Sequence, residues 1–277
     1  MAKSRIRAFL AATALLARFA SAEAQDQIPL SEGNGEAAAP YTCTHPPYKI
    51  HLFSQSPLVI YIAGFLTPDE RAHLLHLAGD TFTHSAINTS NGTTISDSIR
   101  TSSSTTVALD DPVVQCIESR ALAFQGLPGL PRSHLEPIQL VRYAAGEHYH
   151  FHTDWFVDPA HSTARFGGQR TTSFFGYVGV GDGTTGGGTN FPVLDIPDDD
   201  PAWCRFVDCD EARDRGVTFR PIEGNVVFWQ NVGPDGLGDD RTLHAGLPVT
   251  SGWKVGMNIW TREGPLGRDV RGEAAWE

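Results

Sequence analysis

Basic residues are scarce in this sequence of 277 residues. Lysine and arginine number 21 against 32 aspartates and glutamates, which gives a formal net charge of −11 at pH 7. Such a chain has no basic face for phosphates, so nucleic acid is not an expected partner. With 40% hydrophobic and 19% charged residues, the composition excludes collagen-like, coiled-coil and multi-span membrane classes and is typical of a soluble globular protein.

Glycine and proline, in contrast, are abundant, at 28 and 18 residues. Residues that reverse the chain favour many short strands and loops over a helical bundle. No internal repeat is visible, and no proline- or serine-rich linker divides the second half of the chain. We therefore expect one large domain.

The N-terminus has the parts of a secretory signal peptide. Lys3, Arg5 and Arg7 precede a short apolar run at residues 8–17, and small residues follow up to Ala24. Ten apolar residues are too few to cross a bilayer, so no stable membrane span is expected. The pattern predicts a signal peptide at residues 1–24 and entry into the secretory pathway, with either residence in the ER lumen or secretion.

Four cysteines fit an oxidising compartment, where an even number is usually paired in disulfides. Cys204 and Cys209 are close enough in sequence to pair locally, which leaves Cys43 and Cys116 as a second pair, although three connectivities are open. Two acceptor triplets for N-glycosylation begin at Asn88 and Asn91, in a stretch that we expect to be an exposed loop of a glycoprotein.

Hydrophobic periodicity predicts helices first and strands later. Residues 25–47 are predicted to be a flexible lead-in. The fold is expected to begin near residue 48, and its first predicted strand is at residues 58–62. Helices are predicted from the capping box at Thr67 to Gly79, and from Asp111 to Gly126. Strands follow at 138–143, 148–154, 172–180, 225–230 and 254–261. This order indicates an α+β fold, a double-stranded β-helix (jelly-roll) barrel with helices packed on one face.

The densest group of potential metal ligands lies between residues 148 and 154. In a β-strand His148, His150, His152 and Asp154 would point to one side. A buried face with four such groups requires a metal or a hydrogen-bond network. The alternative is a polar strand face exposed to solvent.

A distant histidine favours the metal. The pair His152 and Asp154, together with His244, forms the two-histidine, one-carboxylate pattern that holds Fe(II) and leaves open coordination positions. Lys254 alternates with Val255 and shares a strand face with Trp260. If that face points into a barrel, Lys254 is a buried cation that needs an anion such as a dicarboxylic co-substrate; if it points outward, Lys254 is an ordinary solvated lysine.

Several motifs in this order resemble those of the prolyl 4-hydroxylase type of 2-oxoglutarate- and Fe(II)-dependent dioxygenases. The likeness covers roughly residues 58–262 and is carried by three segments and one preceding tetrapeptide: Tyr143–Asp154, Gly186–Pro192, His244–Trp260 and Arg100–Ser103. It implies a dioxygenase domain at residues 48–264 between the lead-in and a C-terminal tail at 265–277. It also implies Fe(II), 2-oxoglutarate and O2, with ascorbate as a further cofactor.

Carried over residue by residue, the resemblance implies three groups of site residues. The iron ligands would be His152, Asp154 and His244. The 2-oxoglutarate carboxylate would be held by Lys254, Tyr143 and Thr189, because desolvating that carboxylate requires a cation and hydroxyl donors. The substrate would contact the side chains of Tyr149, Arg170 and Trp260.

The sequence also departs from the family pattern. Gly188 replaces a glutamate and Phe151 a frequent proline, and residues 197–219, rich in aspartate, read as an insertion that could reshape the substrate entrance. The additional histidines His148 and His150 are not expected to bind the metal, because three ligands suffice. We expect them to lie on the surface or beside the ligands.

The expected reaction is hydroxylation of an unactivated C–H bond, most simply in peptidyl proline, with decarboxylation of 2-oxoglutarate to succinate and CO2. Because Asp154 supplies a carboxylate ligand, oxygen transfer is favoured over halogenation. One alternative is a tailoring oxygenase of a small natural product, since fold and metal site do not fix the substrate. A second is a non-catalytic metal-binding jelly-roll module that holds zinc or copper. The oligomeric state is not predicted.

Overall fold

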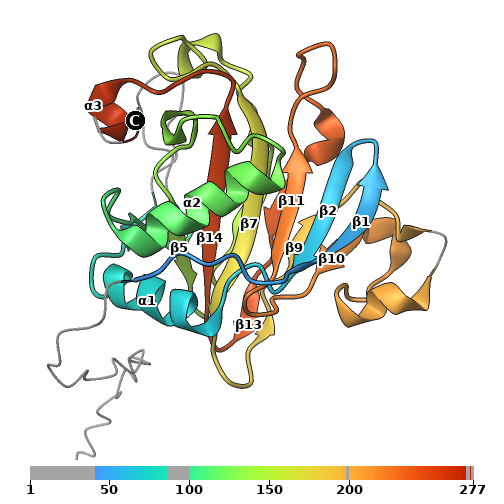
Figure 1. Ribbon diagram of the computed structural model, residues 1–277. Coiled ribbons are helices and arrows are strands. Elements are labelled where there is room, and N and C mark those ends of the chain that lie inside the picture. The colour runs from blue at the N-terminus through green and yellow to red at the C-terminus, as the bar shows by residue number, and fades with distance from the viewer. Residues whose placement is uncertain (1–40, 86–99, 198–199, 273–274, 276–277) are drawn as a thin grey trace, which may run out of the picture. The chain divides into compact units, whose positions relative to one another are not determined.

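The computed structural model describes residues 41–85, 100–197, 200–272 and 275. Within them, an eight-stranded sheet carries the helices α1 (Pro68–Ala78) and α2 (Pro112–Phe124) on one face and faces a four-stranded sheet on the other (Figure 1). A third, two-stranded sheet closes one end. Every strand pairing in these sheets is antiparallel. The predicted α+β jelly-roll fold with helices on one face is confirmed.

The strands have the following order and bounds. The large sheet runs β1 (Lys49–Gln55), β2 (Leu58–Ala63), β11 (Val226–Gln230), β7 (Arg170–Val180), β14 (Lys254–Arg262), β5 (Gln139–Tyr143), β4 (Ser103–Thr106), β3 (Thr83–His84). The second sheet runs β10 (Val217–Phe219), β9 (Thr189–Phe191), β12 (His244–Gly246), β6 (Tyr149–His152). The two-stranded sheet pairs β13 (Val249–Ser251) with β8 (Thr185–Gly186).

Helices account for the remaining regular structure of the described residues. The α-helices are α1 (Pro68–Ala78), α2 (Pro112–Phe124) and α3 (Arg268–Arg271). Short 3-10 helices are η1 (Arg132–His134), η2 (Pro159–His161), η4 (Pro201–Arg205), η5 (Arg213–Arg215) and η6 (Asp240–Thr242).

Side chains fix the starts of the two long helices, as the sequence predicts. The Thr67 hydroxyl accepts a hydrogen bond from the Glu70 amide, and the Glu70 carboxylate accepts one from the Thr67 amide, which is the reciprocal capping box. Asp111 caps α2 by accepting from the amides of Val113 and Val114. Both helices begin with proline at the first turn, where a missing amide proton costs nothing.

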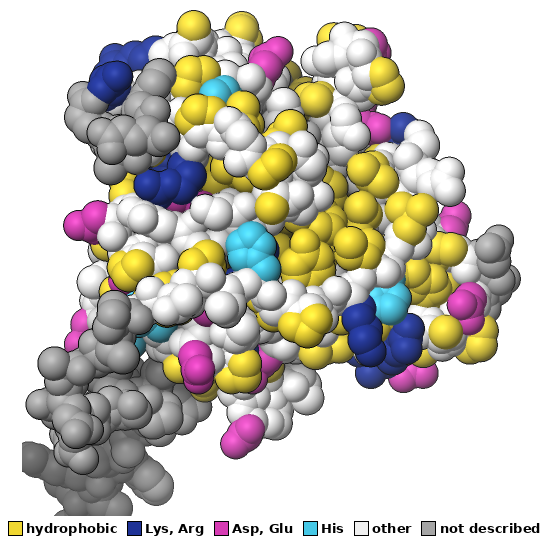
Figure 2. Space-filling view, in the orientation of Figure 1, with side chains coloured by type: hydrophobic (Ala, Val, Ile, Leu, Met, Phe, Trp, Pro, Cys, Tyr) yellow, Lys and Arg dark blue, Asp and Glu magenta, His cyan; other side chains and the backbone are white. Residues whose placement is uncertain are grey.

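Alternation along β7 divides the core into two layers. Phe174 and Val178 pack under the helices, whereas Phe175 and Tyr177 point between the two sheets. The helices cover β5, β14 and β7 and reach β11, where the ring centroids of Phe124 and Phe228 lie 5.1 Å apart, and they leave the face of β1 open (Figure 1). Hydrophobic side chains are visible over that open face in Figure 2, and on β1 Ile50 is 56% and Leu52 47% exposed.

Two disulfides join the pairs expected from the sequence. Cys43 pairs with Cys116 of α2, and Cys204 pairs with Cys209. The predicted signal peptide, most of the lead-in and both glycosylation triplets lie outside the described residues. In the described part of the chain, none of the helices has the length and apolar character that crossing a membrane requires.

The C-terminal segment packs on the domain. Leu266 is buried, and the buried Arg271 of α3 forms an ion pair with Glu118 of α2, which also binds Arg132. Residues up to 272 thus contribute to the body of the fold, although the sequence separates them as a tail beginning at residue 265.

Candidate functional site

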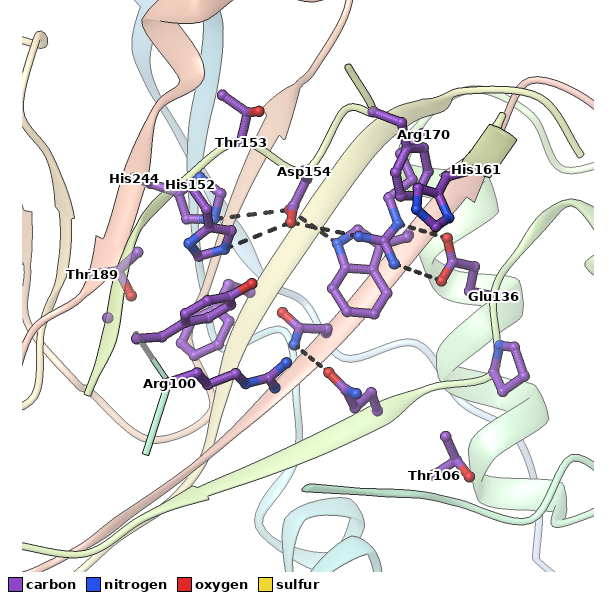
Figure 3. Close-up of a pocket in the computed structure, with 18 of the residues that line it drawn as sticks. Arg100, Thr106, Glu136, His152, Thr153, Asp154, His161, Arg170, Thr189 and His244 are labelled. Atoms are coloured by element: carbon purple, nitrogen blue, oxygen red, sulfur yellow. Dashed lines mark hydrogen bonds and ion pairs between the residues drawn. The ribbon is translucent and has the colours of Figure 1, made fainter. Parts of the chain in front are cut away.

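A cavity of about 430 Å³ opens between the two sheets (Figure 3). Its lining includes eight of the nine residues that the sequence singles out for function: Tyr143, Tyr149, His152, Asp154, Arg170, Thr189, His244 and Trp260. The ninth, Lys254, lies directly behind the ring of Tyr143. The fold therefore brings all nine residues together, from β5, β6, β7, β9, β12 and β14.

Three of these side chains form a compact cluster on the second sheet. His152 at the end of β6 pairs in register with His244 at the start of β12, and Asp154 follows β6 by two residues. Asp154 Oδ1 lies 3.9 Å from His152 Nε2, and Asp154 Oδ2 lies 3.9 Å from His244 Nε2. Ligand atoms from the three residues lie within 4.8 Å of one another, which is close enough to hold one metal ion.

Hydrogen bonds orient both imidazoles as metal ligands need to be oriented. His152 Nδ1 is 2.8 Å from the His150 carbonyl oxygen, and His244 Nδ1 is 2.9 Å from that of Thr242. A carbonyl only accepts, so each Nδ1 carries a proton, and each Nε2, which faces Asp154, is the ring nitrogen left for a metal. Burial, together with the neighbouring His244, lowers the pKa of His152 to about 3, which keeps its ring neutral.

Asp154 is ionised and firmly held. Burial by itself would raise its pKa, but His244, Arg170 and His152 and a hydrogen bond from Ser173 outweigh burial and lower the pKa to about 2. Asp154 Oδ2 accepts from Ser173 Oγ at 2.6 Å and from Trp260 Nε1 at 2.9 Å. A buried carboxylate beside two imidazoles is the donor set that suits Fe(II).

A bulge in β6 changes which residues accompany His152. The four residues of β6 from Tyr149 to His152 oppose the three residues of β12 from His244 to Gly246, so strict alternation is interrupted. The Tyr149 ring stacks on the His152 ring with centroids 3.7 Å apart. The Arg100 guanidinium lies 4.6 Å from the centroid of the same Tyr149 ring. His150 is exposed, and neither His148 nor His150 lines the cavity. The single polar face predicted for these histidines is therefore wrong at residues 148 and 150.

Lys254 is fully buried at the start of β14. Its ammonium lies 4.5 Å from the centre of the Tyr143 ring and donates a hydrogen bond to the Gly187 carbonyl. Burial lowers its pKa to about 7, and among the described residues no carboxylate lies within ion-pair distance of it. Along β14, Val255, Met257 and Ile259 pack under the helices, so Lys254 and Trp260 do share the face that points between the sheets.

Thr189 and Tyr143 lie beside this lysine, at the inner end of the cavity. Burial raises the pKa of the Tyr143 phenol to about 12, so it remains a hydrogen-bond donor. The Thr189 hydroxyl is 2.8 Å from the hydroxyl of Tyr177, which also donates to the Phe219 carbonyl at 3.2 Å. One cation and three hydroxyl groups thus lie close together beside the cavity, a combination that would suit a desolvated carboxylate.

Arg170 stands between the metal-ligand cluster and the outer cavity. Its guanidinium makes two hydrogen bonds to Glu136, at 2.6 and 2.8 Å, and lies 3.8 Å from the centre of the Trp260 ring (Figure 3). Glu136 also accepts from Arg262 at 2.6 Å. These contacts fix Arg170 and Trp260 in place at the wall of the cavity.

The segment at residues 197–219 does not shape this cavity. None of the residues that line the cavity comes from it; instead Trp203 packs on Phe53 of β1 and Phe206 on Tyr61 of β2, with ring centroids 4.8 and 4.4 Å apart. The expectation that this segment reshapes the entrance is therefore wrong for its described residues. Its aromatic side chains instead pack against strands β1 and β2 at the edge of the large sheet.

The glycine that departs from the family pattern has a steric reason. A Cβ atom on Gly188 would lie 2.3 Å from Thr218 Cγ2 and 2.8 Å from the Phe219 carbonyl oxygen. Strand β10 approaches the backbone here too closely for any other residue, so Gly188 belongs to the packing of β9 against β10.

Sequence reasoning missed four polar residues of this site: Ser173, Tyr177, Asn231 and Glu136. Ser173 and Tyr177 are polar side chains on the face of β7 opposite Phe174, two positions to either side of the apolar Phe175. That alternation is the signal that could have revealed them. Asn231 and Glu136 lie just outside strands and carry no such signal.

Comparisons with known proteins agree on one family. The 2OG-Fe(II) oxygenase superfamily matches residues 138–262. Two Arabidopsis thaliana proteins, a probable prolyl 4-hydroxylase 4 and prolyl 4-hydroxylase 1, are each 31% identical to this chain; the matches cover 77% and 78% of it, and 70% and 72% of the relatives.

Among solved structures, the fold is similar to that of a viral collagen prolyl hydroxylase from Paramecium Bursaria Chlorella virus-1, determined with 2-oxoglutarate. The TM-score is 0.51 at 23% identity, over 74% of this chain and 95% of the other. This likeness supports the jelly-roll fold.

Proposed function

Because the chain belongs to the prolyl 4-hydroxylase family of 2-oxoglutarate- and Fe(II)-dependent oxygenases, we propose that it hydroxylates proline residues of a peptide. As a member of that family the protein is an oxygenase that uses Fe(II), 2-oxoglutarate and O2. The observation that carries the proposal is the cavity with the His152, Asp154 and His244 cluster on its wall and the buried Lys254 behind Tyr143.

Three residues would hold the iron. His152 and His244 offer their Nε2 atoms, and Asp154 offers an ionised carboxylate, so the donor set fits Fe(II). Bound Fe(II) would supply the activation of O2, with one oxygen atom entering the substrate C–H bond and the other entering succinate as 2-oxoglutarate loses CO2. The hydrogen bonds of Asp154 to Ser173 and Trp260 keep that carboxylate from turning away.

Three residues would hold the 2-oxoglutarate carboxylate remote from the keto group. Lys254 has no anionic partner of its own in the described chain and would gain one from the co-substrate. Tyr143 and Thr189 would donate hydrogen bonds to the same carboxylate. Because these groups are buried, they also exclude water from the inner end of the cavity.

The substrate would lie in the outer part of the cavity, against Tyr149, Arg170 and Trp260. Stacking and ion pairs already fix these side chains, so they present a preorganised wall for a peptide. The names of the Arabidopsis relatives favour proline as the target. A small natural product and a non-catalytic metal module are not favoured, since the relatives are hydroxylases and the site combines metal-ligand and anion-binding groups.

The proposal also covers the segments of the chain, its cellular compartment and its modifications. We propose a signal peptide at residues 1–24, a lead-in at 25–47, a catalytic domain at 48–264 and a C-terminal segment at 265–277. Two disulfides support an oxidising compartment, the ER lumen or the exterior. Glycosylation at Asn88 and Asn91 and a requirement for ascorbate complete the proposal.

The substrate class is tested by offering Fe(II)-loaded protein a panel of proline-rich peptides and a matched panel of small molecules. Mass spectrometry should find one added oxygen atom on proline in at least one peptide, and the Asp154→Ala variant should add none. Oxygen added only to small molecules would contradict the peptide assignment while leaving the oxygenase class intact.

A further inference from the structure

We propose that Asn231 and Ser173 form a hydrogen-bond relay that holds Asp154 with a single carboxylate oxygen free for the metal. Both would be positioning residues of the iron site, since neither touches the cavity. The proposal rests on the proposed role of Asp154 as an iron ligand.

The relay begins at the carboxylate. Asp154 Oδ2 accepts two hydrogen bonds, from Ser173 Oγ at 2.6 Å and from Trp260 Nε1 at 2.9 Å. A carboxylate oxygen has about two lone-pair positions, so Oδ2 is filled. Among the described residues, Oδ1 accepts no hydrogen bond; the Arg170 guanidinium lies 3.8 Å from it, and it faces His152 Nε2 at 3.9 Å. Oδ1 is therefore the oxygen available to the metal.

Asn231 determines where the Ser173 proton points. Its side-chain amide donates to Ser173 Oγ at 2.8 Å, and both side chains are 0% exposed. A serine hydroxyl has one proton; when the hydroxyl accepts from Asn231, that proton is directed at Asp154. If the amide were replaced by an acceptor, the serine proton would be drawn away from Asp154, and the carboxylate would lose its shortest hydrogen bond.

The backbone of Asn231 is anchored without its side chain. Its amide donates to the Thr171 carbonyl at 2.8 Å, and its carbonyl accepts from the Asp239 amide at 2.9 Å. Residue 231 thus joins the end of β11 to β7 whatever its side chain is. A change from amide to carboxylate at this position alters the relay while leaving these strand contacts in place.

Metal affinity is the direct readout, because removal of a partner that orients a ligand typically costs 10–100-fold in binding. Mn(II), which needs no O2 or co-substrate, serves as the probe, and its dissociation constant is measured by electron paramagnetic resonance on the full chain. Ser173→Ala and Asn231→Asp should each weaken Mn(II) binding by at least about tenfold.

Thr172→Val is the matched control. Thr172 is the neighbouring residue on β7, and its hydroxyl makes an equally short bond, 2.7 Å to Gln125, but on the helix side of the sheet. This variant loses the hydroxyl of a partly buried residue without approaching Asp154, so its Mn(II) affinity should match that of the unmodified protein.

The double variant Ser173→Ala, Asn231→Asp separates a relay from two unrelated losses. If both residues act through one bond to Asp154, the double variant should bind Mn(II) no more weakly than the weaker single variant. Additive losses would overturn the relay, as would unchanged affinity in a folded Ser173→Ala protein. Asp154→Ala tests the premise: if it binds Mn(II) as tightly as the unmodified protein, the iron-site assignment fails, whereas loss of binding there with intact single variants refutes only the relay.

Discussion

Lys254 is the residue whose environment depends most on the co-substrate. Its ammonium is buried beside Tyr143 with a backbone carbonyl as its hydrogen-bond acceptor. Lys254→Met should therefore raise the dissociation constant of 2-oxoglutarate by at least about 30-fold, since breaking a buried charge pair costs about 2 kcal/mol or more. Calorimetric titration with Mn(II)-loaded protein measures this. A keto acid without the remote carboxylate should lose no affinity, and an unchanged constant for 2-oxoglutarate would show that another cation holds it.

The same lysine predicts a pH dependence of co-substrate binding. Burial lowers its pKa from 10.5 to about 7 in the protein without 2-oxoglutarate, so Lys254 is protonated below that pH and neutral above it. Only the protonated form attracts a carboxylate, and bound 2-oxoglutarate favours that form. The dissociation constant should accordingly rise as pH increases above about 7, approaching tenfold per unit. Titrations across this range with Lys254→Met, which should give a flat profile, check the assignment; a flat profile in the unmodified protein would contradict it.

Tyr177 decides whether Thr189 has a proton to offer. The phenol carries one proton and faces two acceptors, Thr189 Oγ1 and the Phe219 carbonyl. Thr189 can donate to a carboxylate most readily when Tyr177 donates to Thr189. Tyr177→Phe should weaken 2-oxoglutarate binding by about 2–10-fold, the value of one hydrogen bond, and leave Mn(II) affinity unchanged. Equal binding in a folded variant would remove Tyr177 from the site.

At the scale of elements, much of the fold is predictable from local signals. Thr67 and Asp111 start the two long helices, and alternation along residues 254–261 places Lys254 and Trp260 on the inner face. The metal-ligand cluster is also predictable, because its spacing on one strand and a distant histidine forms a recognisable pattern. These features depend on neighbours in sequence or on a known motif.

Other features depend on strand pairing and have no local signature. The bulge in β6 arises where it pairs with β12, and it turns Tyr149 rather than His150 toward His152. Asn231 reaches Ser173 only because β11 lies beside β7. The sequence does not reveal which strands are neighbours, so the hydrogen-bond partners of Asp154 emerge only from the folded sheets.

The packing of β9 against β10 makes a separate prediction. Gly188→Ala places a Cβ against Thr218 and the Phe219 carbonyl, which should lower the free energy of unfolding by about 1–3 kcal/mol. Denaturant unfolding measures the change. Gly129→Ala, where the surroundings are open, is the control and should be nearly neutral. A stable Gly188→Ala protein would show that β10 moves aside readily.

At the scale of the whole molecule, the two disulfides differ in what they join. Cys43–Cys116 ties the segment before β1 to α2 across 73 residues, whereas Cys204–Cys209 closes a loop within one surface segment across 5. Loop-closure entropy predicts a stabilisation of about 4 kcal/mol for the first and about 2 kcal/mol for the second.

Thermal unfolding of the paired serine variants, Cys43→Ser with Cys116→Ser and Cys204→Ser with Cys209→Ser, tests this difference. The first pair should show the larger fall in melting temperature. A larger fall in melting temperature for the second pair would contradict the loop-closure estimate. It would mean that the segment at residues 197–219 stabilises the domain by more than the entropy of closing its short loop.

Formation of succinate tests the proposed function of the whole molecule most directly. Fe(II)-loaded protein is supplied with 2-oxoglutarate and O2, with and without a proline-rich peptide, beside the His152→Ala variant. We expect peptide-stimulated succinate in step with hydroxylated proline, and neither product from the folded variant. Succinate formation that persists undiminished in His152→Ala would contradict the iron site that His152, Asp154 and His244 are proposed to form.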